Sequence, residues 1–150
     1  MVQLIGDEFG VNEPLNSSGL SVLMHCAASG NAEMLQIILD KGPNLDLTDK
    51  FGRTALHYAC KADNLKTLTI LGEQEEIEVN CVTNGGKTPL MMAVEQGDPE
   101  LVRTCLNMSA APFIKDVLGQ TAKDYCLFFE KDKREEILRQ LEMSENQWTS

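Results

Sequence analysis

The chain has 150 residues, of which 43% are hydrophobic and 24% charged, and its formal net charge is −10. This composition excludes a disordered chain, because disorder needs low hydrophobicity combined with high charge. The negative charge also argues against bulk binding to nucleic acid or to anionic membranes, whose phosphates it repels. An acidic surface either favours a basic partner segment or only keeps the chain dissolved, and both interpretations stay open.

Further features argue against a membrane anchor and against secretion. No apolar run approaches the roughly twenty residues that a membrane span needs, and the start MVQLIGDEFG lacks the basic flank and long apolar stretch of a signal peptide. The five cysteines are scattered and never form a Cys-x-x-Cys pair, which argues against a disulfide framework and a zinc site. We therefore expect a reducing compartment, the cytoplasm or the nucleus, and no metal or cofactor.

The chain begins with a segment that fits two interpretations. Residues 1–17 contain VQLIGDEFGVN, which aligns with the end of an outer helix and the loop after it, as in Ile37 to Asp46. The segment is then an N-terminal half unit or cap. Alternatively, the chain was cut here from a longer one.

From residue 18 onward the sequence repeats itself. Four glycines recur at intervals of 33 or 34 residues, and a hydroxyl residue stands two positions after each. The pairs are Gly19 and Ser21, Gly52 and Thr54, Gly86 and Thr88, and Gly119 and Thr121. Recurrence at this period is typical of stacked structural repeats. We place the repeats at 18–50, 51–84, 85–117 and 118–150, the last including a C-terminal cap and tail.

Each repeat contains the signals for a turn followed by two helices. A stretch such as 49–52, Asp-Lys-Phe-Gly, has aspartate first and glycine last, which favours a type I turn. The hydroxyl residue after it is a preferred helix N-cap, a contact worth about 1 kcal/mol. A polar break follows, and apolar residues at intervals of three and four then predict a second, amphipathic helix.

The last repeat has a capping-box pattern at the start of its inner helix and a more charged outer segment. Thr121 and Asp124 have the spacing of a capping box, which predicts a well-defined start for the last inner helix. The final outer segment, EKDKREEILRQLE, is more charged than its counterparts, as suits a unit that ends an array.

Two repeats carry a family resemblance. The second, FGRTALHYACKADNLKTLTIL, resembles the ankyrin-repeat pattern G-x-T-P-L-H-x-A-A, and the third, GGKTPLMMAVEQGDPELVRTCL, is nearly as close. The resemblance covers roughly residues 18 to 142. It implies an all-α solenoid of stacked antiparallel helix pairs with projecting β-turn loops, about four repeats plus an N-terminal half unit. It also implies that His57 hydrogen-bonds the turn region and transfers no proton.

The resemblance further implies an adaptor or scaffold that binds a partner protein or peptide through a concave face of turns and inner helices. On the turns, the candidate partner-binding residues are Lys50, Phe51, Arg53, Asn84, Lys87, Val117, Leu118 and Gln120. On the inner helices, the candidates are Tyr58, Lys61, Ala62, Met92, Glu95, Gln96 and Phe128. Of these we expect five to be exposed as apolar anchors, the kind of residue that dominates interface energy: Phe51, Tyr58, Met92, Leu118 and Phe128.

The sequence leaves other functional alternatives open. The loop after the second outer helix carries Glu73, Glu75, Glu76 and Glu78, which either bind a basic segment of a partner or are only solvated. The chain is either a free-standing, monomeric adaptor or the interaction or regulatory domain of a larger protein, including a regulatory subunit of an enzyme. It contains no phosphate-binding loop, metal-ligand cluster or Ser-His-Asp pattern, so we expect no catalysis by the chain itself.

Overall fold

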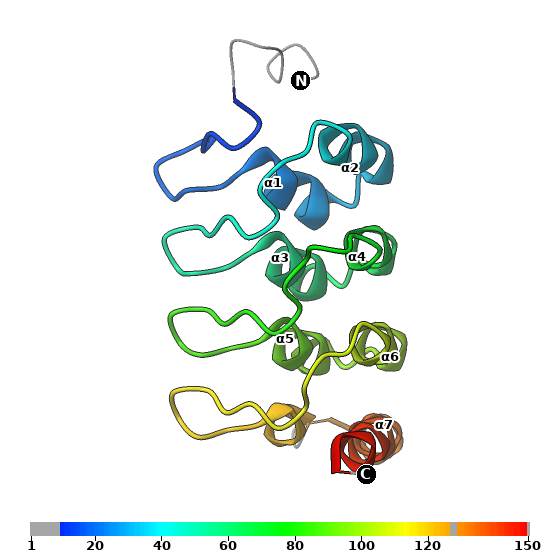
Figure 1. The fold of residues 1–150 in the computed structure, drawn as a ribbon. Helices are drawn as coiled ribbons and strands as arrows, with labels where there is room; N and C mark the ends of the chain where they lie inside the picture. Colours follow the sequence, from blue (N-terminus) through cyan, green and yellow to red (C-terminus); the bar gives the residue numbers. More distant parts are fainter. Residues whose placement is uncertain (1–9, 127–128, 150) are drawn as a thin grey trace.

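A computed structural model describes residues 10–126 and 129–149 as four stacked helix pairs (Figure 1). Units 1 to 3 are α1 (Val22–Ser29) with α2 (Ala32–Leu39), α3 (Ala55–Lys61) with α4 (Leu65–Gly72), and α5 (Pro89–Gln96) with α6 (Pro99–Asn107). Unit 4 pairs the 3-10 helix η2 (Ala122–Cys126) with α7 (Lys131–Thr149). These two ranges contain no strand. Most of the N-terminal half unit expected at 1–17 falls outside the described residues.

The layers are arranged alike in all units. The first helix of each pair, the inner helix, lies in the middle of the stack, and the second, the outer helix, lies to one side (Figure 1). The loop before each inner helix projects to the opposite side. Inner helices contact one another in sequence, α1 with α3, α3 with α5, and α5 with η2. The predicted all-α stack with projecting turns is therefore confirmed.

The inner helices of units 1 to 3 begin where the hydroxyl residues predict. Ser21, Thr54 and Thr88 are the N-caps of α1, α3 and α5. The hydroxyl oxygens of Ser21 and Thr88 each accept a backbone N–H of the first turn at 3.2 Å. These contacts satisfy donors that have no partner within the helix.

His57 connects two units through its imidazole. The ring is fully buried, its Nδ1 accepts the Thr54 N–H at 3.0 Å, and its Nε2 lies 2.9 Å from the Lys87 carbonyl. The hydrogen-bond network thus assigns the proton to Nε2. Burial lowers the pKa of His57 and keeps the ring neutral. The structural role implied by the resemblance is confirmed, because the ring ties α3 to the turn of unit 3.

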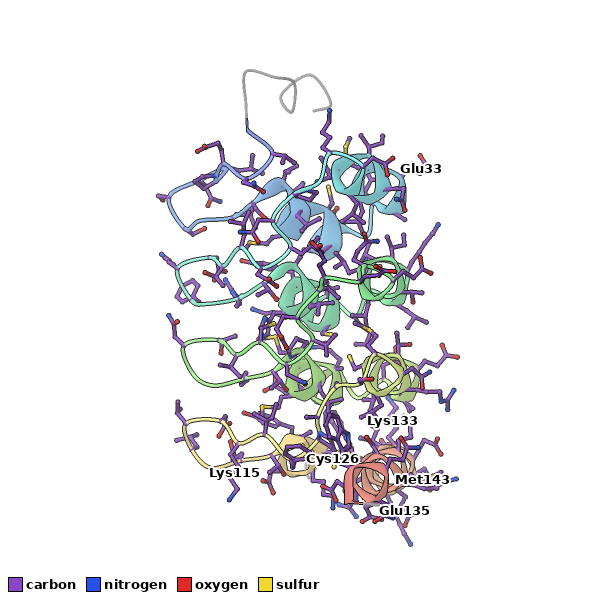
Figure 2. All side chains as sticks on the ribbon, viewed as in Figure 1. Glu33, Lys115, Cys126, Lys133, Glu135 and Met143 are labelled. Atoms are coloured by element: carbon purple, nitrogen blue, oxygen red, sulfur yellow. The ribbon has the colours of Figure 1, made fainter. Side chains whose placement is uncertain are left out.

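One apolar cluster runs through all four units, and Figure 2 shows side chains filling the space between the layers. Full burial of a Leu or Ile side chain stabilises a fold by about 1.5–3 kcal/mol. The outer helices contribute the buried residues Leu35, Ile38, Leu68, Leu71, Leu101, Val102, Cys105, Ile137 and Leu141. Because each unit packs against its neighbours, the stack shares one interior.

Unit 4 departs from the expectation of a full inner α-helix. Asp124 accepts the Thr121 N–H at 2.8 Å, so one half of the predicted capping box forms. The Asp124 N–H, however, donates to the Thr121 carbonyl at 3.0 Å, a contact between residues three apart that defines a 3-10 turn. The inner helix is therefore short, and α7, with 19 residues, is the longest outer helix.

Other structural findings limit the chemistry of the described residues. None of their helices is long and apolar enough to cross a membrane. Among residues 10–126 and 129–149, no group of His, Cys, Asp and Glu is arranged to hold a metal ion. All five cysteines are free thiols, and Cys26, Cys60, Cys105 and Cys126 are buried within the apolar cluster.

Candidate functional site

The projecting loops end in four turns, which we call fingers 1 to 4 (residues 15–20, 49–53, 83–87 and 116–120). The backbone N–H of the glycine in fingers 2, 3 and 4 donates to the carbonyl three residues earlier, at 2.8–3.0 Å. A second backbone bond closes the base of each finger, from Asp49 to Arg53, from Thr83 to Lys87 and from Asp116 to Gln120. Two backbone hydrogen bonds therefore close each of these three fingers.

Backbone hydrogen bonds also join each finger to the next. The Lys50 N–H donates to the Ser18 carbonyl at 2.9 Å, the Asn84 N–H to Phe51 at 2.9 Å, and the Val117 N–H to Gly85 at 3.0 Å. The Asn84 side-chain amide adds a bond to the Lys50 carbonyl at 3.0 Å. The fingers thus form one hydrogen-bonded ladder, and a rigid scaffold that presents loop residues is a common basis for recognition.

Finger 2 is built around the buried carboxylate of Asp49. Asp49 accepts hydrogen bonds from the backbone N–H groups of Phe51 and Arg53, both at 2.9 Å, from Arg53 Nε at 2.7 Å and from the Tyr58 hydroxyl at 2.5 Å. Burial alone would raise the pKa of Asp49, but the hydrogen bonds from Tyr58 and Arg53 outweigh it and lower the pKa. Arg53 and Tyr58 are therefore fixed in place before any partner arrives.

Two aromatic rings, Phe51 on finger 2 and Tyr58 on α3 behind it, lie close to cations. Phe51 is half exposed, with the Lys50 ammonium 5.1 Å and the Arg53 guanidinium 4.8 Å from its ring centre. The guanidinium also lies 4.9 Å from the centre of the Tyr58 ring. Burial and the bond to Asp49 raise the pKa of Tyr58 to about 12, so its hydroxyl remains a donor. The result is a cation–π cluster on a protruding finger.

Beside this cluster lies an open hollow of about 300 Å³. It is lined by Ala28 of α1, by Tyr58 and Lys61 of α3, and by Ala62. Small alanines form part of its lining, the tyrosine ring is apolar, and Lys61 is exposed. This volume is at the lower end of ligand pockets, which span about 300–1,000 Å³.

Comparison with known proteins identifies the family. The family model for ankyrin repeats in three copies matches residues 1–83, and the single ankyrin-repeat model matches residues 85–117. The chain belongs to the ankyrin-repeat family. Ankyrin repeats are protein-interaction modules, and the fingers and inner helices described above are their turns and first helices.

Curated relatives place similar ankyrin stretches in very different proteins. The chain is 30% identical over 107 residues to human transient receptor potential cation channel subfamily A member 1, covering 67% of this chain and 10% of the channel. It is 33% identical over 112 residues to the phosphocholine transferase AnkX of Legionella pneumophila, covering 73% of this chain and 12% of that protein. A putative ankyrin repeat protein of Rickettsia bellii is 28% identical over 124 residues, covering 82% of this chain and 68% of the relative. The chain therefore spans only about a tenth of the first two relatives.

Within the ankyrin stack, the predicted residues of unit 2 lie together. Lys50, Phe51 and Arg53 are on finger 2, and Tyr58 and Lys61 are on α3 behind it. Phe51 is exposed as expected, Tyr58 is only partly buried, and the hollow joins Tyr58 to Lys61 and Ala62. Their part in binding stays a prediction.

The predicted residues of unit 3 differ from the expectation in one respect. Met92 was expected to be an exposed anchor, but it is only 7% exposed, because α5 is flanked by α3 on one side and η2 on the other. Lys87 and Glu95 form an ion pair, and the Lys87 ammonium also lies 5.1 Å from the centre of the Tyr125 ring. Gln96 is exposed at the end of α5. Unit 3 therefore offers polar atoms and no apolar anchor at Met92.

In unit 4, the tip of the finger is apolar. Val117 and Leu118 are 72% and 78% exposed, while the backbone N–H of Gln120 is held by the Asp116 carboxylate at 2.9 Å. The predicted anchor Phe128 lies outside the described residues. Finger 4 is therefore a second apolar tip, distant in sequence from the cluster on finger 2.

Sequence reasoning missed a tyrosine–aspartate hydrogen bond that recurs at fingers 2 and 4. Tyr125 donates its hydroxyl hydrogen bond to Asp116, as Tyr58 does to Asp49. Asp116 also accepts the backbone N–H groups of Leu118 and Gln120, both at 2.9 Å. The signal was present in the sequence, because in both units a tyrosine follows the first aspartate of the turn by nine residues.

The acidic loop lies apart from the fingers. Its glutamates Glu73, Glu75 and Glu76, which follow α4, line a second hollow of about 400 Å³ with Leu39, Gly42, Pro43, Leu45 and Gln74. Glu78 is engaged locally, because its carboxylate accepts the Asn80 N–H at 2.9 Å. The structure therefore gives this loop no feature that singles out a basic partner segment.

Proposed function

We propose that this ankyrin stack is an adaptor or scaffold that binds a partner protein or peptide through fingers 2 to 4 and the inner helices behind them. The observation that supports it most is the cation–π cluster of Lys50, Phe51 and Arg53 on finger 2. Phe51 is half exposed, and the Arg53 guanidinium beside its ring is held in place by Asp49. Aromatic and arginine side chains of this kind dominate the energy of many interfaces.

The proposal has a second form, in which these residues are the interaction or regulatory domain of a larger protein. It is supported by the relatives that are a channel and a transferase by name, of which the chain spans 10% and 12%. In either form the chain itself binds and does not catalyse. A reducing compartment, the cytoplasm or the nucleus, belongs to the same proposal and is supported by five free thiols.

Site-specific photo-crosslinking in the cells that express the chain tests the proposal. A photoreactive phenylalanine analogue replaces Phe51 in one variant and Ile37 in a matched control, because Ile37 is 41% exposed on the outer helix α2. We expect a protein adduct from position 51 that is absent from position 37. Adducts that form only from position 37 would show that the partner binds the outer helices, against the proposal.

A further inference from the structure

The fingers and inner helices of units 1 and 2 carry an unusual charge for this chain. Residues 16–29 contain no carboxylate, and residues 49–62 contain Asp49 with Lys50, Arg53 and Lys61. The one carboxylate, Asp49, is 5% exposed and already accepts four hydrogen bonds. The exposed charges of this face are therefore positive, although the chain as a whole has a net charge of −10.

Two cations on this face are available to a partner. Lys50 and Lys61 are exposed, and neither forms an ion pair with any residue in the described ranges. In unit 3, by contrast, Lys87 is neutralised by Glu95. The carboxyl nearest along the chain, Asp63, belongs to the turn into α4 and interacts with Asp98 of unit 3. Among the cations on the fingers and inner helices of units 1 to 3, those without an ion pair are thus Lys50 on finger 2 and Lys61 at the end of α3.

Apolar surface lies between these two cations. Phe51 stands next to Lys50 on the finger, and the hollow formed by Ala28, Tyr58 and Ala62 adjoins Lys61. A partner that binds both the two lysines and the apolar surface needs negative charge to pair with the ammonium groups and a large apolar side chain to enter the hollow. Charge complementarity of this kind sets the specificity and the association rate of an interface.

We infer that this face recognises an acidic segment of a partner protein, in which aspartate or glutamate residues flank a large apolar side chain. The inference rests on the proposed function and gives the partner its chemistry. A nucleic acid would also supply negative charge. The rest of the chain, however, has more carboxylates than cations and repels a long polyanion, whereas a short acidic segment meets only the local positive charge.

Selection from random peptides displayed on phage tests the inference with the intact chain as bait. We expect the enriched peptides to carry at least two carboxylates near a Leu, Phe or Trp. The Lys50→Glu, Lys61→Glu double variant should bind them at least about tenfold more weakly. The matched control is Lys41→Glu with Lys66→Glu, which makes the same change in net charge at exposed lysines of the outer-helix side and should change the affinity less than about twofold.

The outcomes separate the inference from the proposed function. Enriched peptides that lose affinity with Phe51→Ala but carry no carboxylates overturn the inference and leave the binding face intact. Peptides whose binding is unchanged by Phe51→Ala, or a library from which nothing binds, overturn both. A single-stranded oligonucleotide that binds as tightly as the peptides, with the same loss for the double lysine variant, also overturns the inference, because the partner is then a nucleic acid. Circular dichroism of each variant shows that it is folded.

Discussion

Fingers 2 and 3 have the same backbone hydrogen bonds but different networks of side-chain hydrogen bonds. Gly52 and Gly86 close their turns with nearly equal hydrogen bonds, of 3.0 and 2.8 Å. In finger 2, however, Asp49 holds Arg53 and Tyr58, whereas in finger 3 the residue at that position is Thr83, whose hydroxyl accepts only the Lys87 N–H at 3.2 Å. The turn thus forms with either network, and the side chains decide what each finger presents to a partner.

The inner helices behind these fingers differ in a similar way. In α3 the buried third residue is His57, which bonds both to Thr54 and to the Lys87 carbonyl of the next unit. In α5 that position is Met91, whose sulfur accepts the Thr88 N–H at 3.5 Å and makes no such link. Unit 2 is therefore connected to its neighbour by polar contacts that unit 3 replaces with apolar packing.

The largest effect is expected where the shared backbone is altered. A Cβ added at Gly86 would lie 2.9 Å from both the Cα of Asp116 and the N of Val117, and Gly86 has φ +82°. Gly86→Ala should lower the free energy of unfolding by about 3 kcal/mol, since it combines left-handed backbone strain with a clash between fingers. In Gly119→Ala, where φ is +77° and nothing lies within 4 Å, the loss should be about 1 kcal/mol. Urea denaturation measures both, and equal losses would contradict the rigid ladder of fingers.

The second prediction exchanges the residues that distinguish the two inner helices. His57→Met gives α3 the residue of α5, and it should lower stability by about 2 kcal/mol because the buried Lys87 carbonyl loses its donor. Because the pKa of His57 is lowered in the folded protein, the ring is protonated in the unfolded chain first as the pH falls below about 6.5. Protonation of the unfolded chain lowers the stability of the wild type. The advantage of the wild type should therefore shrink between pH 7 and pH 5, as thermal unfolding at each pH would show. A constant difference would mean that the ring is not buried in its neutral form.

The third prediction removes the charge that organises finger 2. Asp49→Asn keeps the shape of the side chain but weakens its bonds to Arg53 and Tyr58, and it should lower stability by about 1.5 kcal/mol at pH 7. Because the folded pKa of Asp49 is lowered, its contribution is present above about pH 4 and is lost as the pH falls through the folded pKa. Thr83→Val, the counterpart on finger 3, should lose only about 0.5 kcal/mol. A larger loss of stability for Thr83→Val than for Asp49→Asn would contradict the claim that the Asp49 network contributes more to stability than the Thr83 network.

The smallest expected effect concerns the turn between the two helices of unit 2. The equivalent residues in units 1 and 3, Gly30 and Gly97, are left-handed helix C-caps, whereas Asp63 adopts φ +53° without being glycine. Asp63→Gly should therefore raise stability by about 0.5–1 kcal/mol.

A second variant separates charge from backbone strain at this turn. Partial desolvation, and then the interaction with Asp98, raise the pKa of Asp63 to about 6, so the folded state gains stability as the pH falls through 6. Asp63→Asn removes only the charge, and its gain should be smaller because the carboxyl is exposed and screened. That gain should shrink as the pH falls below about 6 and disappear below about pH 4, whereas part of the Asp63→Gly gain should persist. Identical pH profiles for both variants would contradict the strain argument.

Much of this fold follows from the sequence because its signals are local. The recurring glycines and hydroxyl residues fix the turns and the N-caps of α1, α3 and α5, as Ser21, Thr54 and Thr88 confirm. The clustering of Phe51 with Arg53 also follows, since both residues belong to one finger.

The features that the sequence did not predict depend on contacts between units. Periodicity placed Met92 on a face of α5 but could not show that α3 and η2 flank that helix. The 3-10 form of η2 escaped prediction because the Thr121 and Asp124 side chains fit a capping box in sequence, while the backbone bonds to the third residue. A hydrogen bond from His57 to the turn region was expected only through the family resemblance, and its partner, the Lys87 carbonyl, was not predicted.

The most direct test of binding through finger 2 is the map of backbone amides whose NMR signals shift when a selected acidic peptide is titrated into the chain. The largest changes should fall in residues 49–62, with smaller changes in finger 3 and almost none in α2, α4 and α6. Changes concentrated on the outer helices, with finger 2 unaffected, would contradict this mode of binding.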